Sequence, residues 1–359
     1  PHEPWYVPKK YFDAFPIEKI QLPPGYREDD LNDLPAQAKR LGPNRYFAHI
    51  RKHNQWKKAV QGYLASIYFA DTMLGNVLET LQNGPNSDST IVILWSDHGW
   101  HLGEKEHWQK FTAWRACTRV PLIVRVPKGT KGLPDGTKPS VCTEPVSLLS
   151  LAPTLLELNG LNLNENYDGP SLVPLLADPT RKWPHVATTY LDAPGSFSVS
   201  AKEWRYIKYA DGGEELYNIA KDPYEWRNLA SDTSSQSELK KMRSHGPVKF
   251  AKLVKPALNT LPQLEWLTLT DKQMAPPSKP DGNPFEVTFV NKTDRRVELF
   301  WMMPNDGRKS YRLLDSGQRF AQQTRPGAVW MISETKEDGG ESLGFFKVGD
   351  RSARAVIVD

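Results

Sequence analysis

The chain has 359 residues, of which 39% are hydrophobic and 25% charged, and its formal net charge is +4. At about 100–200 residues per domain, this length allows two or three domains, and the 30 prolines indicate a loop-rich globular protein rather than a helical bundle. The small charge excess suits a polyanionic ligand but is too mild to indicate nucleic-acid binding. We expect no membrane span, because no apolar run approaches the ~20 residues that one needs.

Residues 1–183 have the pattern of an α/β core. Apolar residues at helical spacing predict a helix over 56–81, and residues 146–160 predict a second helix. Between them, the runs TIVILW (90–95) and VPLIVRV (120–126) are typical of buried strands. Helix, strand, strand and helix in this order favour a mainly parallel sheet flanked by helices.

Three further regions follow this core. Short half-alternating strands and one charged helix predict a small antiparallel subdomain over residues 184–262, and the polar, proline-rich residues 263–284 are expected to form a linker. About seven short strands with turns between them then indicate an all-β sandwich over residues 285–359. The only cysteines, Cys117 and Cys142, leave a single bridge open, with two reduced thiols as the default expectation.

The densest ionisable chemistry follows the strand predicted at 90–95. Asp97 and His98 lie at its carboxyl end, where ligands bind in parallel α/β sheets. Both side chains can face one ion only if the backbone turns, and Gly99 supplies that freedom. A carboxylate suits a hard cation such as Ca²⁺ or Mg²⁺, and a neutral imidazole can complete the shell. Because calcium takes about six to eight ligands, most of the shell must come from elsewhere.

Two other interpretations of this stretch stay open from the residues alone. Asp97 can simply cap the segment after the strand, with His98 as a surface histidine. A zinc site from His98, His101 and His107 is the other option, although their spacing is not the His-Glu-x-x-His pattern of a helical zinc site.

The stretch SDHGWHLGEKEHWQKFTAWRACTRVPLIVRVP resembles the sulfatase family of the alkaline-phosphatase superfamily, and within it the iduronate-2-sulfatase-like group. The segments PHEPWYVPKKYFDAFP, YLASIYFADTMLGNVLETL and WRYIKYADGGEELYNIAKDPYEWRNLA are similar to other landmarks of the family in the same order, although Ser150 stands where an aspartate is common. The resemblance covers roughly residues 1–260. It implies a sulfuric-ester hydrolase that acts on sulfated carbohydrate and is exported to the periplasm or the cell exterior.

The resemblance also implies a role for individual residues. Asp97 and His98 would be ligands of a divalent cation, usually calcium in this family, and Lys110 would contact the sulfate group. His2 would contact sulfate as well and protonate the leaving alkoxide. A transferring sulfuryl group needs positive charge on its oxygens and a proton donor at the departing oxygen, which this set would supply.

Two neighbouring side chains, Trp100 and His101, would line the substrate pocket by the same resemblance. The plain alternatives are a solvated lysine at Lys110 and a frayed chain terminus at His2.

Sulfatases attack with a formylglycine made from the first residue of a Cys/Ser-x-Pro-x-Arg motif, and no cysteine or serine of this chain fits that motif. The paired aspartates that complete the family's metal shell are absent too. Because the chain begins at Pro1 with no methionine or signal peptide, we expect a fragment or cleavage product that is inactive without the N-terminal half of the core. A phosphoester or phosphonate hydrolase of the same superfamily and a non-catalytic, polyanion-binding relative stay open.

The segment FEVTFVNKTDRRVELFWMMPNDGRKSYRLLDSGQRFAQQTRPGAVWMI resembles the von Hippel–Lindau-type β domain, one face of which recognises hydroxyproline. Trp330 matches the pocket tryptophan, Thr324 stands where a serine is usual, and Tyr311 belongs to the same pattern. Ala328 replaces the expected histidine. We therefore expect an adhesion or substrate-targeting module with a protein or matrix ligand, and Trp330 as a simple core residue is the alternative.

Overall fold

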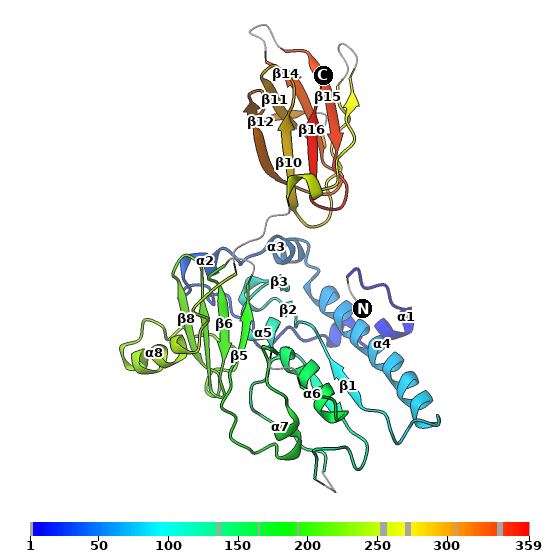
Figure 1. Cartoon of the computed structure of the whole chain (residues 1–359), viewed down its shortest axis with the longest axis vertical. Coiled ribbons are helices and arrows are strands. Elements are labelled where there is room, and N and C mark those ends of the chain that lie inside the picture. Colours follow the sequence, from blue (N-terminus) through cyan, green and yellow to red (C-terminus); the bar gives the residue numbers. More distant parts are fainter. Residues whose placement is uncertain are drawn as a thin grey trace. The chain divides into compact units, whose positions relative to one another are not determined.

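The computed structural model describes residues 3–134, 138–163, 166–191, 194–251, 257–269, 274–305, 307–335 and 340–358. The chain divides into two compact units, Pro1–Lys252 and Leu253–Asp359 (Figure 1). Within the described ranges, no helix is both long enough and apolar enough to cross a membrane.

The first unit opens with helices and loops that precede the core strands. They are α1 (Lys9–Asp13), η1 (Ile17–Lys19), α2 (Ala36–Lys39), α3 (Arg45–Lys52) and α4 (Trp56–Gln82). The prediction of a helix over 56–81 is confirmed by α4. It ends at Gln82, before Asn83, Gly84 and Pro85, which are unfavourable in a helix. The Asn44 side chain caps α3 by accepting a hydrogen bond from the Phe47 backbone N–H at 2.9 Å.

Both predicted core strands are present, but the expected parallel arrangement is wrong for this pair. Strand β1 (Val92–Trp95) pairs antiparallel with β4 (Leu122–Arg125). Parallel neighbours need a crossover connection, usually a helix. The chain between these two strands instead contains only short elements: β2 (His101–Leu102), η2 (Glu104–Glu106), β3 (Trp108–Gln109) and α5 (Arg115–Thr118).

Helices and a second sheet complete the first unit. The second predicted helix is divided into η3 (Leu148–Ser150) and α6 (Leu151–Leu158), and α7 (Val173–Ala177) follows. Within the region predicted as a small antiparallel subdomain, a four-stranded antiparallel sheet has the order β5 (Ala187–Tyr190), β6 (Phe197–Ser200), β7 (Trp204–Lys208), β8 (Glu214–Asn218), whereas the predicted end of that region, residues 253–262, belongs to the second unit. After η4 (Thr233–Ser235), helix α8 (Gln236–Ser244) packs its Leu239 and Met242 on this sheet and ends before Gly246 and Pro247.

The second unit is a β-sandwich, as the strand spacing predicts. One sheet has the order β13 (Arg319–Thr324), β10 (Phe285–Asn291), β16 (Ala353–Ile357). The other has the order β12 (Arg308–Leu314), β11 (Val297–Met302), β14 (Val329–Glu334), β15 (Ser342–Lys347), β9 (Leu267–Thr268). Phe289, Leu299, Trp330 and Phe346 fill the core between the sheets.

The segment expected to be a linker, residues 263–284, is part of this sandwich where the structure describes it. Strand β9 pairs antiparallel with β15, and η5 (Leu258–Thr260) precedes it. Trp266 packs on the sandwich core, and Ser278 is buried and donates its hydroxyl to the Val329 carbonyl. The sequence did not predict this packing, because the segment is rich in proline and polar residues. It is held by backbone pairing and by one large aromatic side chain, which give no periodic apolar pattern.

Candidate active site

A sharp turn at the end of β1 sets the direction of the candidate metal ligands. The Gly99 N–H donates to the Cys117 carbonyl at 2.6 Å, and the Trp100 N–H donates to the Ala116 carbonyl at 3.0 Å. A side chain at Gly99 would bring its Cβ within 2.2 Å of the Ala116 oxygen, so only glycine allows this approach to α5. The turn therefore depends on the glycine that the sequence pattern singled out.

Asp97, His98 and Lys110 meet beyond this turn. The Lys110 Nζ lies 2.9 Å from the His98 Nε2, and an Asp97 carboxylate oxygen lies 3.6 Å from the same nitrogen. Strands β2 and β3 pair His101 with Gln109, and this hairpin returns the chain so that Lys110 reaches His98. The expected convergence of these three side chains is present.

The hydrogen bonds of His98 leave one ring nitrogen available to a ligand. Its Nδ1 lies 2.8 Å from the Gly99 carbonyl, which can only accept, so Nδ1 carries the proton and Nε2 presents a lone pair. This lone pair now accepts from the Lys110 ammonium. A cation at Nε2 would have to displace that ammonium, which would then be free to meet an anion beside the cation.

Asp97 and His98 can supply ligands on one side of a cation site, but they do not complete its coordination shell. Asp97 is 75% exposed at its side chain and offers a carboxylate, and His98 offers Nε2. Throughout the described ranges, no group of three or more His, Cys, Asp and Glu side chains is placed to hold a metal ion. The zinc interpretation is therefore wrong for these residues, and a calcium shell would need several more oxygen ligands.

His101, expected to line the substrate pocket, lies in the core instead. It is fully buried, its Nδ1 is 3.1 Å from the Glu104 carbonyl, and its Nε2 is 2.6 Å from the Thr112 hydroxyl. Burial holds the pKa of His101 well below its ordinary value, so the ring is neutral. The alternation along β2 turns this ring inward, and a direct contact with substrate is excluded in this structure.

Trp100 keeps a position next to the site. Its ring centroid lies 6.4 Å from that of His98, and it packs against Trp5 and Tyr63. His2 lies outside the described residues. The next residue, Glu3, accepts a hydrogen bond from the Gln109 side chain at 2.5 Å, which holds the start of the described chain beside β3.

The loop that carries Lys110 has an unusual backbone. Four non-glycine residues within seven positions have positive φ: Lys105 (55°), Glu106 (49°), Gln109 (84°) and Phe111 (71°). Each such residue costs of order 1–3 kcal/mol and persists only when the surroundings hold it in place. Such strain is a frequent feature of functional loops.

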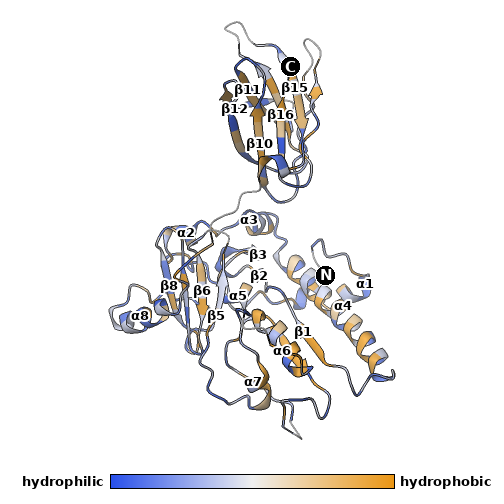
Figure 2. Cartoon of the chain, viewed as in Figure 1, coloured by the Kyte–Doolittle hydropathy of each residue, from blue (hydrophilic) through white to orange (hydrophobic). Residues whose placement is uncertain are grey.

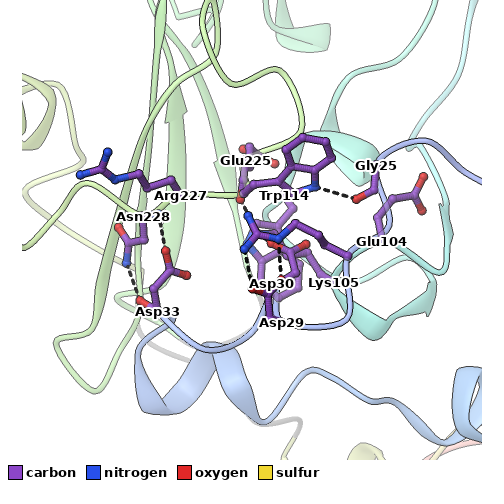
Figure 3. Close-up of polar contacts among 12 residues, drawn as sticks. Gly25, Asp29, Asp30, Asp33, Glu104, Lys105, Trp114, Glu225, Arg227 and Asn228 are labelled. Atoms are coloured by element: carbon purple, nitrogen blue, oxygen red, sulfur yellow. Dashed lines mark hydrogen bonds and ion pairs between the residues drawn. The ribbon is translucent and has the colours of Figure 1, made fainter.

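A buried ionic cluster holds this loop. The ammonium of Lys105, only 2% exposed, donates to the Asp30 carboxylate at 2.7 Å and to the Glu225 backbone carbonyl. The Glu225 carboxylate in turn forms an ion pair with the Arg205 guanidinium, with 2.9 Å between the Glu225 Oε1 and the Arg205 Nε. Figure 3 shows Asp30, Lys105 and Glu225 brought together from three separate segments.

A second buried carboxylate extends the cluster. Glu215 accepts hydrogen bonds from the Trp114 indole at 2.8 Å, from the Tyr209 hydroxyl at 2.7 Å and from the Tyr217 hydroxyl at 2.5 Å. Burial raises the pKa of Glu215 and of Glu225, and it raises the pKa of Asp30 to about 6 although Lys105 opposes this shift. The cluster ties the N-terminal loops and the antiparallel subdomain to the Lys110 loop.

Sequence reasoning missed this cluster. The signal was present as charged residues inside otherwise apolar patterns, such as Arg205 between Trp204 and Tyr206 on β7. A charge at such a position needs a buried partner, but the pattern does not say which one.

In the second unit, two of the three expected ligand residues are core residues. Trp330 is 2% exposed, and its indole N–H donates to the buried Thr324 hydroxyl at 3.0 Å. Tyr311 is 40% exposed and packs edge-on against Trp330, with ring centroids 4.9 Å apart. Of the three, only Tyr311 offers a free surface to a ligand in this structure.

Known families match the first unit. Residues 1–161 match the family described as sulfatase, and residues 103–246 match the family described as N-sulphoglucosamine sulphohydrolase, C-terminal. These matches place residues 1–246 in the sulfatase family, within the alkaline-phosphatase-like superfamily.

Individual relatives agree with this assignment. A sulfatase of Formosa agariphila is 40% identical over 250 residues, which are 68% of this chain and 47% of the relative. Human iduronate 2-sulfatase is 32% identical over 202 residues, 48% of this chain and 36% of the relative. The chain therefore spans about half or less of the length of these relatives.

The fold also has relatives among solved structures. The phosphonate monoester hydrolase of Silicibacter pomeroyi superposes with a TM-score of 0.56 at 23% identity, over 68% of this chain and 53% of that one. At this identity the likeness shows the fold alone.

Proposed function

We propose that the first unit is part of an exported sulfatase that hydrolyses sulfuric esters of carbohydrates. The observation that carries this proposal is the meeting of Asp97, His98 and Lys110, with the lysine nitrogen 2.9 Å from the imidazole. A carboxylate, an imidazole and an ammonium in one place, with a cation that the first two would help to hold, would suit an anionic ester whose charge moves onto its leaving oxygen during hydrolysis.

Each residue has a proposed role. Asp97 and His98 Nε2 hold one side of a divalent cation, Ca²⁺ in our proposal, which would draw negative charge from the sulfate oxygens. Lys110 would leave His98 and donate to a sulfate oxygen if His98 Nε2 held the cation. His2 is proposed as the proton donor to the leaving oxygen, and Trp100 as one wall of the pocket.

The rest of the site is proposed to come from other residues of the family core, including a formylglycine nucleophile and further carboxylate ligands. The surface of the first unit supports a missing neighbour. Apolar residues on α4, β1 and β4 are exposed, among them Val77, Trp95 and Ile123. Figure 2 shows the hydrophobic character of α4 and β1. Exposed apolar surface of this extent is typical of an interface.

The names of the relatives support a carbohydrate substrate. Iduronate 2-sulfatase and N-sulphoglucosamine sulphohydrolase are both named for sulfated sugars.

The proposal is tested with a chimera that joins the part of the Formosa agariphila sulfatase outside the match to this chain, expressed in a host that installs formylglycine. We expect hydrolysis of an aryl sulfate by the chimera and none by the chain alone. Lys110→Ala in the chimera should lower kcat/KM about 10²–10³-fold, as loss of one transition-state donor does. Lys128→Ala, at an exposed lysine after β4, is the matched control.

Two results would overturn the proposal. The first is a folded, formylglycine-bearing chimera without sulfatase activity, or one in which Lys110→Ala and Lys128→Ala have equal effects. The second is hydrolysis of aryl sulfate by the chain alone that Lys110→Ala abolishes, which would refute the need for further residues.

A phosphonate monoester hydrolase is the second candidate, because the Silicibacter pomeroyi enzyme shares this fold and the fold alone does not separate the two activities. The same chimera distinguishes the two, since an aryl phosphonate monoester would then be the better substrate by kcat/KM. A non-catalytic polyanion-binding protein predicts binding without turnover of either ester.

A further inference from the structure

In the second unit, the two strands at one edge of the β-sandwich carry charges of a single sign, and the one acidic residue in the turn between them, Asp315, pairs with Arg296. Strands β12 and β13 are the terminal strands of the two sheets and follow one another through a short turn, so they form one open edge. Residues 308–314 and 319–325 together contain five basic residues and no acidic one. The whole unit from 253 to 359 is nearly neutral, with 15 basic and 14 acidic residues, so the charge is concentrated at this edge.

The cations of β12 are fixed against aromatic rings. The Arg308 guanidinium lies 4.6 Å from the centroid of the Phe300 ring, and the Lys309 ammonium lies 5.3 Å from that of Tyr311. The third, Arg312, stacks 4.9 Å above Phe320.

All three cations are exposed to solvent, and within the described part of the chain no acidic side chain forms an ion pair with them. Cations held on aromatic faces keep their charge but have lost side-chain freedom, so less entropy is lost when an anion binds.

The shape of this edge restricts its ligand. Neighbouring residues of a strand point to opposite faces, so Arg308 and Lys309 lie on opposite sides of β12. A flat ligand on one sheet face would reach only half of the charge, whereas a chain that runs along the edge can reach both sides. Trp330 and Thr324 are buried and hydrogen-bonded to each other, so this pair offers no open pocket to an inserted side chain.

We propose that the edge formed by Arg308, Lys309, Arg312 and Arg319, the cationic edge, binds a linear sulfated polysaccharide. Guanidinium groups match the oxygens of sulfate as they match those of phosphate, with two parallel hydrogen bonds. Sulfates repeat along such a polymer and fit a row of cations better than a single anion does. The choice of sulfate as the anion rests on the proposed function of the first unit, and the cationic edge itself does not.

The simpler interpretation is that these cations only prevent edge-to-edge pairing of strands, which charged residues do at many sheet edges. It predicts no preference among polymers. An acidic protein segment is the other ligand that the charge would suit. The titration described next distinguishes these two alternatives from a sulfated polysaccharide.

The full chain is titrated calorimetrically with dextran sulfate, unsulfated dextran and poly-glutamate at several salt concentrations. We expect binding of dextran sulfate that weakens with salt, no binding of dextran, and weaker binding of poly-glutamate. The triple variant Arg308→Gln, Lys309→Gln, Arg312→Gln should raise the Kd for dextran sulfate about ten-fold or more. The triple variant Lys292→Gln, Lys347→Gln, Arg351→Gln, also at exposed positions of this unit, removes the same charge and should change it little.

Equal losses in the two triple variants would show a net-charge effect and overturn the proposal, as would poly-glutamate binding as tightly as dextran sulfate. If the first triple variant fails to fold, amide shifts of the unmodified chain decide the question: they must change over residues 308–325 on addition of dextran sulfate. Binding to the cationic edge is measured without turnover and is identified by the amide shifts of residues 308–325, so it does not depend on the site in the first unit. Failure of the proposed function and failure of the cationic edge are therefore separate outcomes.

Discussion

Replacing Asp30 by asparagine tests the buried cluster that holds the Lys110 loop. The Asp30 carboxyl is fully buried, and its pKa is raised to about 6, since burial outweighs the opposing effect of Lys105. The folded protein therefore binds a proton at Asp30 between about pH 4 and pH 6, where the unfolded chain has released it. The contribution of Asp30 to stability is present below pH 4 and is lost as the pH rises through 6.

The expected size of this loss follows from the shift. A change from 3.8 to about 6 corresponds to about 3 kcal/mol. Asp30→Asn cannot ionise, so its free energy of unfolding should improve relative to the unmodified chain by about that amount between pH 4 and pH 7. The amide can itself change the free energy of unfolding at pH 4. From that starting value, the free energy of unfolding of the variant should increase with pH relative to that of the unmodified chain.

Urea unfolding of the full chain at pH 4, 5, 6 and 7, followed by tryptophan fluorescence, measures this difference. Asp29→Asn is the matched control, because Asp29 is exposed and pairs with Arg27 at the surface. It should show no such relative gain. A relative loss of stability by Asp30→Asn with rising pH would mean that the Lys105 ion pair outweighs burial, and the reasoning would be refuted.

Three further predictions concern the site and its support. Gly99→Ala should destabilise the first unit by about 1–3 kcal/mol, because its Cβ would meet a carbonyl of α5, whereas Gly75→Ala, inside α4 with nothing within 4 Å, should be neutral or stabilising in thermal unfolding; equal effects would contradict this account of the turn. Trp114→Phe should cost about 1–3 kcal/mol in the same assay, because the buried Glu215 loses a donor, and no loss would show that the remaining hydroxyls suffice. Nitrogen NMR should find the His98 proton on Nδ1 when the ring is neutral, and a proton on Nε2 instead would remove the free lone pair on which the cation proposal depends.

Local pattern predicted the elements better than their pairing. The apolar spacing of 56–81 and the runs at 90–95 and 120–126 gave one helix and two strands, because side-chain burial controls such periods. The direction of pairing depends on the connection between strands, and the short β2–β3 hairpin in that connection has too few residues for a periodic signal.

The candidate site could be predicted only in part for a related reason. The turn at Gly99 and the meeting of His98 with Lys110 follow from a motif within fifteen residues. The partners of Lys105 lie 75 and 120 residues away, at Asp30 and Glu225, and no local pattern links them. His101 was misassigned because a histidine in a polar stretch gives no sign of which face of a two-residue strand it occupies.

The central claim is that Asp97, His98 and Lys110 form one side of a shared cation and sulfate site. A crystal structure of the chimera with CaCl₂ and inorganic sulfate tests it most directly. We predict the cation bound by the Asp97 carboxylate and His98 Nε2, with the Lys110 nitrogen about 3 Å from a sulfate oxygen. A cation bound elsewhere, or Lys110 still on His98 with sulfate at a distant site, would contradict the account.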